Sequence, residues 1–192
     1  SYPLISVDPY TSVWSFADEL NADVTRHWTG KEQALLGVVD VDGVSYRFMG
    51  KETPEEGASV RFATAARQLS VNVLPTQTYY TFECGPVLLD VVFTAPLLLD
   101  DLDRMSMPVN YISWQVRSAD QKKHEVRVSV EAFSSLAVNT EDQAVMVERE
   151  VENGISYLKT GTAEQAVLLR KGDDVRIDWV ISIWRHKWKR RR

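Results

Sequence analysis

The stretch L-L-G-V-V-D-V-D-G-V-S-Y-R-F-M, from Leu35 to Met49, decides the fold class of this chain. Its apolar residues fall into two short segments, 35–40 and 44–49, and the dipeptide Asp42-Gly43 separates them. An Asp-Gly pair between two apolar runs is one of the stronger short-range signals for a β-hairpin. The stretch therefore predicts two antiparallel strands joined by a tight turn.

Short segments of the same kind continue along the chain, separated by turn residues such as Gly85-Pro86 and Asn153-Gly154. Further strands are expected at 60–65, 68–74, 78–84, 87–93, 109–117, 125–132, 144–151, 155–160 and 165–170, and from Val175 to Ile183. Segment 87–93 is almost continuously apolar, which predicts a central strand buried on both faces. Residues 97–105 favour a short helical turn.

Many short antiparallel strands without a sustained helical period predict an all-β fold, a two-sheet antiparallel β-sandwich. The sandwich is expected over residues 33–184, and residues 185–192 form a separate basic tail. Residues 1–32 do not alternate cleanly and predict an irregular segment on the outside of the sandwich. The apolar side chains expected to insert into its grooves are Val7, Tyr10, Val13, Trp14, Phe16 and Leu20.

Composition supports one folded domain, because 192 residues with 44% hydrophobic and 10% aromatic content can form a sizeable core. Cys84 is the only cysteine, which excludes an intrachain disulfide, and its place at the end of an expected strand indicates a buried structural thiol. No apolar run approaches the ~20 residues of a membrane-spanning helix. A membrane span is therefore not expected.

The net charge of −5 hides an asymmetry. Residues 185–192 contain six of the 22 basic residues and no acid, so 16 basic residues remain against 27 acidic ones, a net charge of −11 for residues 1–184. An acidic body disfavours nucleic acid as a partner of the domain. The tail, with its tryptophans and cations, leaves open an arm that binds nucleic acid or an anionic surface.

Three stretches of the sequence carry a family resemblance. They are P-L-I-S-V-D-P-Y-T-S-V-W (3–14), R-H-W-T-G (26–30) and A-A-R-Q-L-S-V-N-V-L-P-T-Q-T-Y-Y-T-F (65–82). The chain resembles the amino-terminal region of the glutaminase A family over nearly all of residues 3–179. The resemblance implies a β-sandwich that precedes a helical α/α toroid, hydrolysis of the glutamine side-chain amide by the full-length protein, and a secreted or periplasmic location.

After Trp179 the sequence departs from that family, in which the strand resembles D-W-G-Y-L-Y-L-A. Deleting one G from the four-G run of TGG GGT TAT CTC TAT TTG GC yields TGG GTT ATC TCT ATT TGG, which encodes W-V-I-S-I-W, the sequence from Trp179 to Trp184. This relation suggests a single-base frameshift, after which residues 180–192 are out of frame and the tail is disordered. On this hypothesis the chain lacks the C-terminal helical domain, and the interrupted sandwich exposes a strand edge from Val175 to Ile183 that favours self-association.

No catalytic residue, cofactor or metal site is predicted, because His27, His124 and His186 lack metal-ligand spacing and no nucleophile motif is present. The one candidate cluster lies in the stretch most specific to the family: Asp8, Trp14, Arg26, His27 and Trp28. Its members could pack the amino-terminal segment onto the sandwich. They could also line a substrate pocket at the junction with the helical domain, since pockets favour domain interfaces.

Two functions therefore stay open at this stage. The first is a non-catalytic sandwich domain of a glutaminase. The second is a carbohydrate- or ligand-binding module in which exposed tryptophan or tyrosine rings stack on sugars.

Overall fold

A computed structural model of the chain describes residues 1–51, 63–153, 155–179 and 182–185. The chain divides into two compact units, unit 1 (Ser1–Ala132) and unit 2 (Phe133–Arg192). Each unit is described by itself below.

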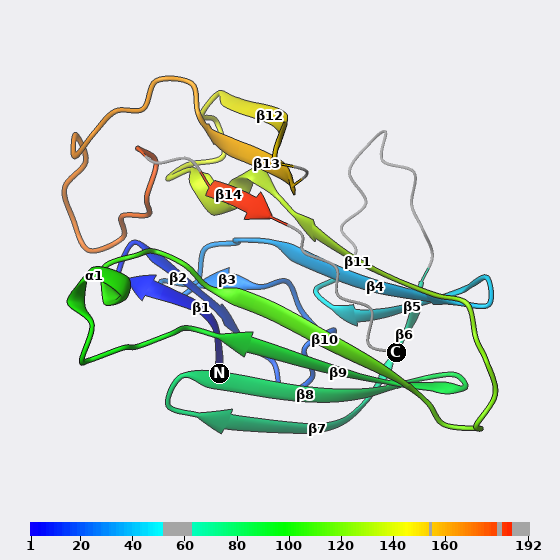
Figure 1. The fold of residues 1–192 in the computed structure, drawn as a ribbon. Helices are drawn as coiled ribbons and strands as arrows, with labels where there is room; N and C mark the ends of the chain where they lie inside the picture. The colour runs from blue at the N-terminus through cyan, green and yellow to red at the C-terminus, as the bar shows by residue number, and fades with distance from the viewer. Residues whose placement is uncertain (52–62, 154, 180–181, 186–192) are drawn as a thin grey trace. The chain divides into compact units, whose positions relative to one another are not determined.

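Unit 1 is built almost entirely of strands (Figure 1). Its elements are β1 (Tyr2–Asp8), β2 (Thr11–Ser15), β3 (Arg26–His27), β4 (Leu35–Val41), β5 (Val44–Met49), β6 (Thr64–Ala65), β7 (Arg67–Leu74), β8 (Gln77–Cys84), β9 (Val87–Thr94), α1 (Leu102–Met105), β10 (Tyr111–Ser118) and β11 (Val126–Ala132). Two four-stranded sheets, ordered β10-β9-β8-β7 and β11-β4-β5-β6, accompany a three-stranded sheet β1-β2-β3. The predicted all-β sandwich is confirmed.

The hairpin predicted at Asp42-Gly43 is also confirmed. Strands β4 and β5 pair antiparallel with Val41 opposite Val44, and the two turn residues have φ angles of 49° and 86°. Positive φ at both central residues matches the right-handed twist of the flanking strands. The local sequence thus sets the register of this hairpin.

The core of unit 1 lies between the two four-stranded sheets. Alternate residues of β8 and β9 are buried, and the rings of Phe48 on β5 and Phe82 on β8 lie 5.9 Å apart across the interface. The prediction that segment 87–93 is buried on both faces is wrong. On the outer face Asp90 accepts hydrogen bonds from Thr81 (2.9 Å) and Arg117 (3.0 Å), which a strand between two apolar layers would not tolerate.

The amino-terminal segment is not irregular, because residues 1–32 contain β1, β2 and β3. Of the six side chains expected to insert into grooves, Val13 and Leu20 are buried, Trp14 is partly buried, and Val7, Tyr10 and Phe16 are exposed. The Nδ2 amide of buried Asn21 donates to the carbonyl oxygens of Arg47 (2.9 Å) and Ala66 (2.8 Å). Hydrogen bonds from a side chain to the backbone therefore attach this segment, in addition to apolar packing.

The helical turn predicted at 97–105 is confirmed as α1. Asp101 precedes its first residue, and the Asp101 side chain accepts a hydrogen bond from the backbone N–H of Arg104 (3.0 Å). This is a standard N-cap arrangement. No residue of α1 is buried.

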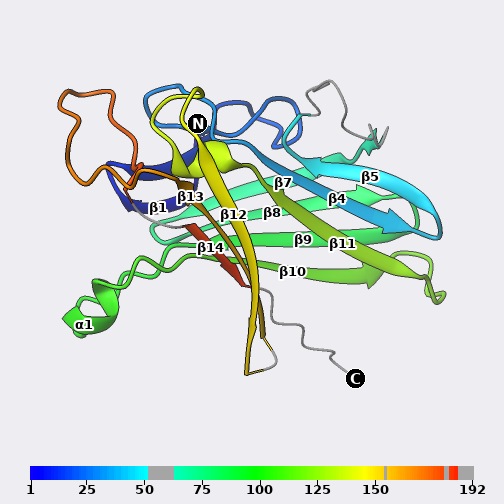
Figure 2. The same ribbon diagram turned by 90° about the horizontal axis from the view of Figure 1, so that it is seen from above.

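Unit 2 contains η1 (Ser134–Ala137), a 3-10 helix, and the strands β12 (Val145–Glu152), β13 (Ile155–Thr162) and β14 (Ser182–Arg185), ordered β12-β13-β14. Figure 2 shows the β12–β13 hairpin predicted at Asn153-Gly154, with Glu152 opposite Ile155. The tail at 186–192 and most of the proposed out-of-frame segment lie outside the described residues.

Two strands predicted in unit 2 are wrong. Segment 165–170 contains positive φ angles at Gln165 (49°) and Leu168 (52°), which interrupt an extended strand. Segment 175–179 is a buried loop, in which the backbone N–H of Arg176 donates to the Asn139 side chain (2.9 Å) instead of to a neighbouring strand. Of the edge predicted from Val175 to Ile183, only its end belongs to a described strand, β14.

Candidate functional site

The five residues of the predicted cluster all belong to the sheet β1-β2-β3 or its turns. Asp8 ends β1, and one oxygen of its carboxylate accepts hydrogen bonds from the backbone N–H groups of Tyr10 and Thr11, both at 2.8 Å. These contacts shape the turn into β2, as aspartate commonly does in tight turns. The Asp8 carboxylate, a candidate site group in the sequence, thus stabilises the turn between β1 and β2.

His27 and Trp28 meet at the same turn. The His27 side chain is fully buried, and its Nε2 lies 3.0 Å from the carbonyl oxygen of Pro9 while its Nδ1 lies 2.9 Å from the Thr29 hydroxyl. A carbonyl oxygen only accepts, so Nε2 carries the proton. The indole N–H of Trp28 donates to the same Pro9 oxygen at 2.7 Å, and the Trp28 side chain is 48% exposed.

Trp14 and Arg26 lie opposite each other on β2 and β3. The Arg26 guanidinium contacts the Asp23 carboxylate (3.3 Å) and the Gly30 carbonyl oxygen (3.2 Å), and it lies 3.6 Å from Glu32. These contacts hold the 23–32 loop. The structure therefore brings His27 and Trp28 together, pairs Trp14 with Arg26, and directs their polar groups to partners inside the fold.

A pocket of about 370 Å³, lined by both apolar and uncharged polar side chains, opens beside this sheet in unit 1. We call it the β1–α1 pocket: its walls are β1, Trp14, the β7–β8 turn, Phe93 and the 95–110 segment. Thr78 donates to the Pro3 carbonyl oxygen (2.7 Å), and Asn110 accepts from the Ser6 N–H (3.2 Å). The described residues that line it include no charged side chain. The pocket therefore suits an uncharged group rather than acid–base chemistry.

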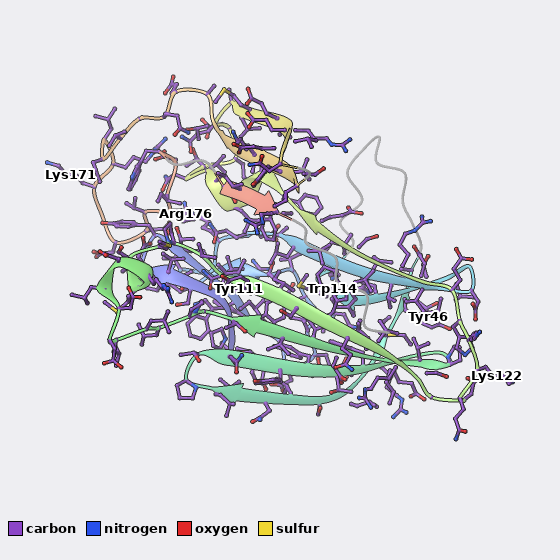
Figure 3. The ribbon with its side chains drawn as sticks, in the orientation of Figure 1. Tyr46, Tyr111, Trp114, Lys122, Lys171 and Arg176 are labelled. Carbon is purple, nitrogen blue, oxygen red and sulfur yellow. The ribbon has the colours of Figure 1, made fainter. Side chains whose placement is uncertain are left out.

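Beside the pocket, the connection from β9 to β10 exposes a run of large apolar side chains that the sequence analysis did not single out. We call it the leucine surface: Leu97, Leu98, Leu99, Leu102, Met107, Val109 and Tyr111. Leu99 and Leu102 are 71% and 68% exposed. Figure 3 shows Tyr111 at the α1 end of β10, with Trp114 further along the strand. In the sequence, the triplet of leucines at 97–99, which lies outside any strand, is the feature that could have indicated this exposed surface.

A histidine between two carboxylates lies elsewhere in unit 1. The Nδ1 of His124 is 2.6 Å from Asp42 and its Nε2 is 2.8 Å from Asp120, so the β4–β5 turn is tied to the 118–125 loop. Hydrogen bonds that His124 donates to Asp120 and Asp42 raise the pKa of His124 above its ordinary value. The same bonds lower the pKa values of Asp42 and Asp120. Lys122 lies 3.6 Å from Asp120.

We expect the stabilising effect of His124 to depend on pH. A raised histidine pKa means that its stabilisation is complete below about pH 6.5 and is lost as the pH rises through the folded-state value. The lowered aspartate pKa values act at the other end, since their stabilisation is present above about pH 4 and is lost as the pH falls through the folded values. The two effects overlap between about pH 4 and 6.5.

Urea unfolding of the parent chain and of His124→Gln measures this effect. The difference in unfolding free energy should be larger near pH ~5.5 than near pH ~9. Lys122→Gln serves as the control and should show no comparable change over this range. An equal difference for His124→Gln at both pH values would contradict the assignment.

Two further polar side chains, those of Cys84 and Asp178, are buried. Cys84 is buried, as predicted, and burial raises the pKa of its thiol to about 12, far from a reactive thiolate. In unit 2, the Asp178 side chain is fully buried and accepts hydrogen bonds from Gln143 (2.8 Å) and Arg170 (2.9 Å). The sequence analysis missed Asp178, which holds the 139–143 loop against the 170–178 loop.

Across the described part of the chain, no three metal-binding side chains cluster together. Within the same part, no helix has the length and apolar character to span a membrane.

Comparison with known proteins finds two matching family models and one similar enzyme. A family model described as a domain of unknown function (DUF5127) matches residues 76–190, and another with the same description (DUF4964) matches residues 1–58. Glutaminase A of Aspergillus oryzae is 24% identical over 191 residues, covering 95% of this chain and 26% of that protein. The chain thus spans about a quarter of that relative, and the predicted resemblance is confirmed. No solved structure matches.

Proposed function

Because the chain belongs to the DUF5127 family and resembles a quarter of glutaminase A, we propose that it is a non-catalytic β-sandwich domain of a glutaminase-like protein. In this proposal the longer protein hydrolyses the side-chain amide of L-glutamine. The catalytic groups belong to a C-terminal helical domain, which the family resemblance implies.

The observation that carries the proposal is how the polar groups of the predicted cluster are used. Asp8 forms a turn, Arg26 holds a loop, and His27 is fully buried with both ring nitrogens bonded. A general acid or base must reach a proton of the substrate. None of these three side chains contributes to the β1–α1 pocket, where Trp14 is the member of the cluster that does.

Glutamine hydrolysis by the chain itself tests the proposal. We expect residues 1–192 to release no ammonia from L-glutamine above the buffer rate, because a packing role supplies no group to activate water. Full-length glutaminase A of Aspergillus oryzae, measured under the same conditions, is the positive control. Ammonia release that scales with the concentration of the purified chain would overturn the proposal.

A carbohydrate-binding function is the second candidate, and one observation favours it. The Trp28 ring is 48% exposed and its indole N–H is held by the Pro9 carbonyl oxygen, so a rigid aromatic face meets solvent beside exposed Tyr10. Aromatic faces of this kind pack against sugar rings. A glycan-binding screen of the parent chain beside Trp28→Ala, run with the ammonia assay, separates the two functions.

The frameshift and the location of the protein are further parts of the proposal. The sequence after Trp179 supports a one-base deletion, since W-V-I-S-I-W follows from the family-like codons after removal of a single G. Resequencing the locus tests this, and an alternate frame that encodes no further sandwich strands would exclude it.

Export from the cytoplasm rests on the family resemblance. Self-association near β14 is tested by light scattering, where a monodisperse monomer would contradict it.

A further inference from the structure

The leucine surface consists of seven exposed apolar side chains within one connection, from Leu97 to Tyr111. Leu97, Leu99, Leu102, Met107 and Tyr111 are each more than half exposed. It continues into the β1–α1 pocket, because Leu97, Met107 and Val109 belong to both. A contiguous apolar patch rarely stays in water unless it is a contact site. Scattered apolar residues elsewhere on the surface require no such explanation.

We propose that the leucine surface and the β1–α1 pocket together form the docking face for the part of the glutaminase-like protein that lies outside the matched quarter. The inference rests on the proposed function, because that part exists only if the chain belongs to a longer protein of this kind. About three quarters of glutaminase A has no counterpart in this chain, so a covering domain is available in such a protein.

The chemistry of the two features defines what the docking partner must present. The pocket has no charged side chain, and its polar Thr78, Gln77 and Asn110 already form hydrogen bonds within unit 1. An uncharged side chain can therefore enter the pocket without breaking those three hydrogen bonds. Residues 97–111 carry three aspartates against one arginine, Arg104. The complementary surface is therefore apolar in the centre and basic at its edge.

The same charges argue against a second copy of this chain as the occupant. A two-fold contact places the same patch of both copies face to face. It would bring Asp100 and Asp103 of one copy close to those of the other, and like charges across an interface cost several kcal/mol. A partner with basic residues at its edge avoids this cost.

The test measures binding in trans. The chain is immobilised, and the portion of Aspergillus oryzae glutaminase A outside the matched region is added as the probe. The parent chain should bind saturably, and the double variant Leu99→Asp/Leu102→Asp should weaken binding at least ~10-fold. The matched control is Leu168→Asp/Leu169→Asp in unit 2, whose leucines are 67% and 77% exposed. The control should bind within about twofold of the parent chain.

Three results would overturn the docking face: no binding by the parent chain, equal binding by the leucine-surface variant, or equal weakening by the control. Loss of a homodimer in the leucine-surface variant, seen by light scattering, would instead identify a second copy as the occupant. Both variants replace exposed residues, and urea unfolding checks that they remain folded. If the double variant does not fold, the milder single variant Leu99→Ser replaces it in the binding measurement. Ammonia release by the chain alone would defeat the proposed function whatever the binding result, so the two failures are distinguishable.

Discussion

Replacing Phe82 with alanine is expected to lower the unfolding free energy of unit 1 by about 3–5 kcal/mol. Phe82 is fully buried on β8, and its ring lies 5.9 Å from Phe48 on the opposite sheet and 6.0 Å from Tyr80, with which it is stacked. The substitution removes apolar contacts with both sheets at once. The remaining side chains are anchored on separate strands and cannot fully close the cavity.

Urea unfolding monitored by hydrogen exchange measures this loss separately in the two units. Slow-exchanging amides of β8 and β9 should lose protection, whereas those of β12 and β13 should change little if unit 2 unfolds independently. Phe82→Leu is the matched control, because it retains most of the buried volume and should cost much less than the alanine. A loss below about 1 kcal/mol for Phe82→Ala would show that Phe82 does not join the two sheets.

Replacing Gly50 with alanine is expected to be the most damaging glycine substitution in unit 1. Gly50 has a φ angle of 74°, and a Cβ atom added there would lie 2.1 Å from the carbonyl oxygen of Leu35. The contact is with backbone, so β4 or the end of β5 must move. Gly50 also donates from its N–H to the Leu20 carbonyl oxygen (3.0 Å), which attaches the amino-terminal segment. A loss of about 3 kcal/mol or more is expected, above the 1–3 kcal/mol of local strain alone.

Gly43→Ala provides the control, because Gly43 also has a positive φ angle, 86°, but nothing lies within 4 Å of its added Cβ. It should cost only about 1 kcal/mol, the conformational penalty without a clash. Thermal unfolding of the two variants in parallel separates the clash from the backbone preference. Equal losses would contradict the close approach of Gly50 to Leu35.

The strands of unit 1 followed from local sequence where their turns were explicit. Asp42-Gly43 predicted the β4–β5 hairpin because positive φ at those residues is a property of the dipeptide itself. The prediction that segment 87–93 is buried on both faces was wrong. An apolar run shows that the side chains on both faces are apolar, but it does not show whether another layer covers each face. Asp90 and Arg117, which form a hydrogen bond on the outer face, are 27 positions apart in the sequence. A short local pattern of residues cannot predict such a contact.

The five candidate residues lie together in the fold, and their role as a functional site stays a prediction. Sequence similarity selected a real structural cluster, since Asp8, Trp14, Arg26, His27 and Trp28 share one small sheet and its turns. Their partners could not be predicted, because Pro9, Thr29 and Asp23 are neighbours only after the turns form. The β1–α1 pocket was missed for the same reason. The pocket joins β1 to residues near 75 and 95–110, which are far apart in the sequence. The leucine triplet of the adjoining leucine surface has no periodicity that would mark a face.

The sequence by itself determined the all-β class, the tight hairpins, the buried state of Cys84 and the resemblance to glutaminase A, because each depends on residues close in the chain or on similarity of the whole. The tertiary structure alone decided which polar groups are already used, which of the chain's leucines stay exposed, and where β1 and the 95–110 segment enclose a pocket. Those properties depend on which distant segments meet, and burial and hydrogen bonding are defined only once they have met.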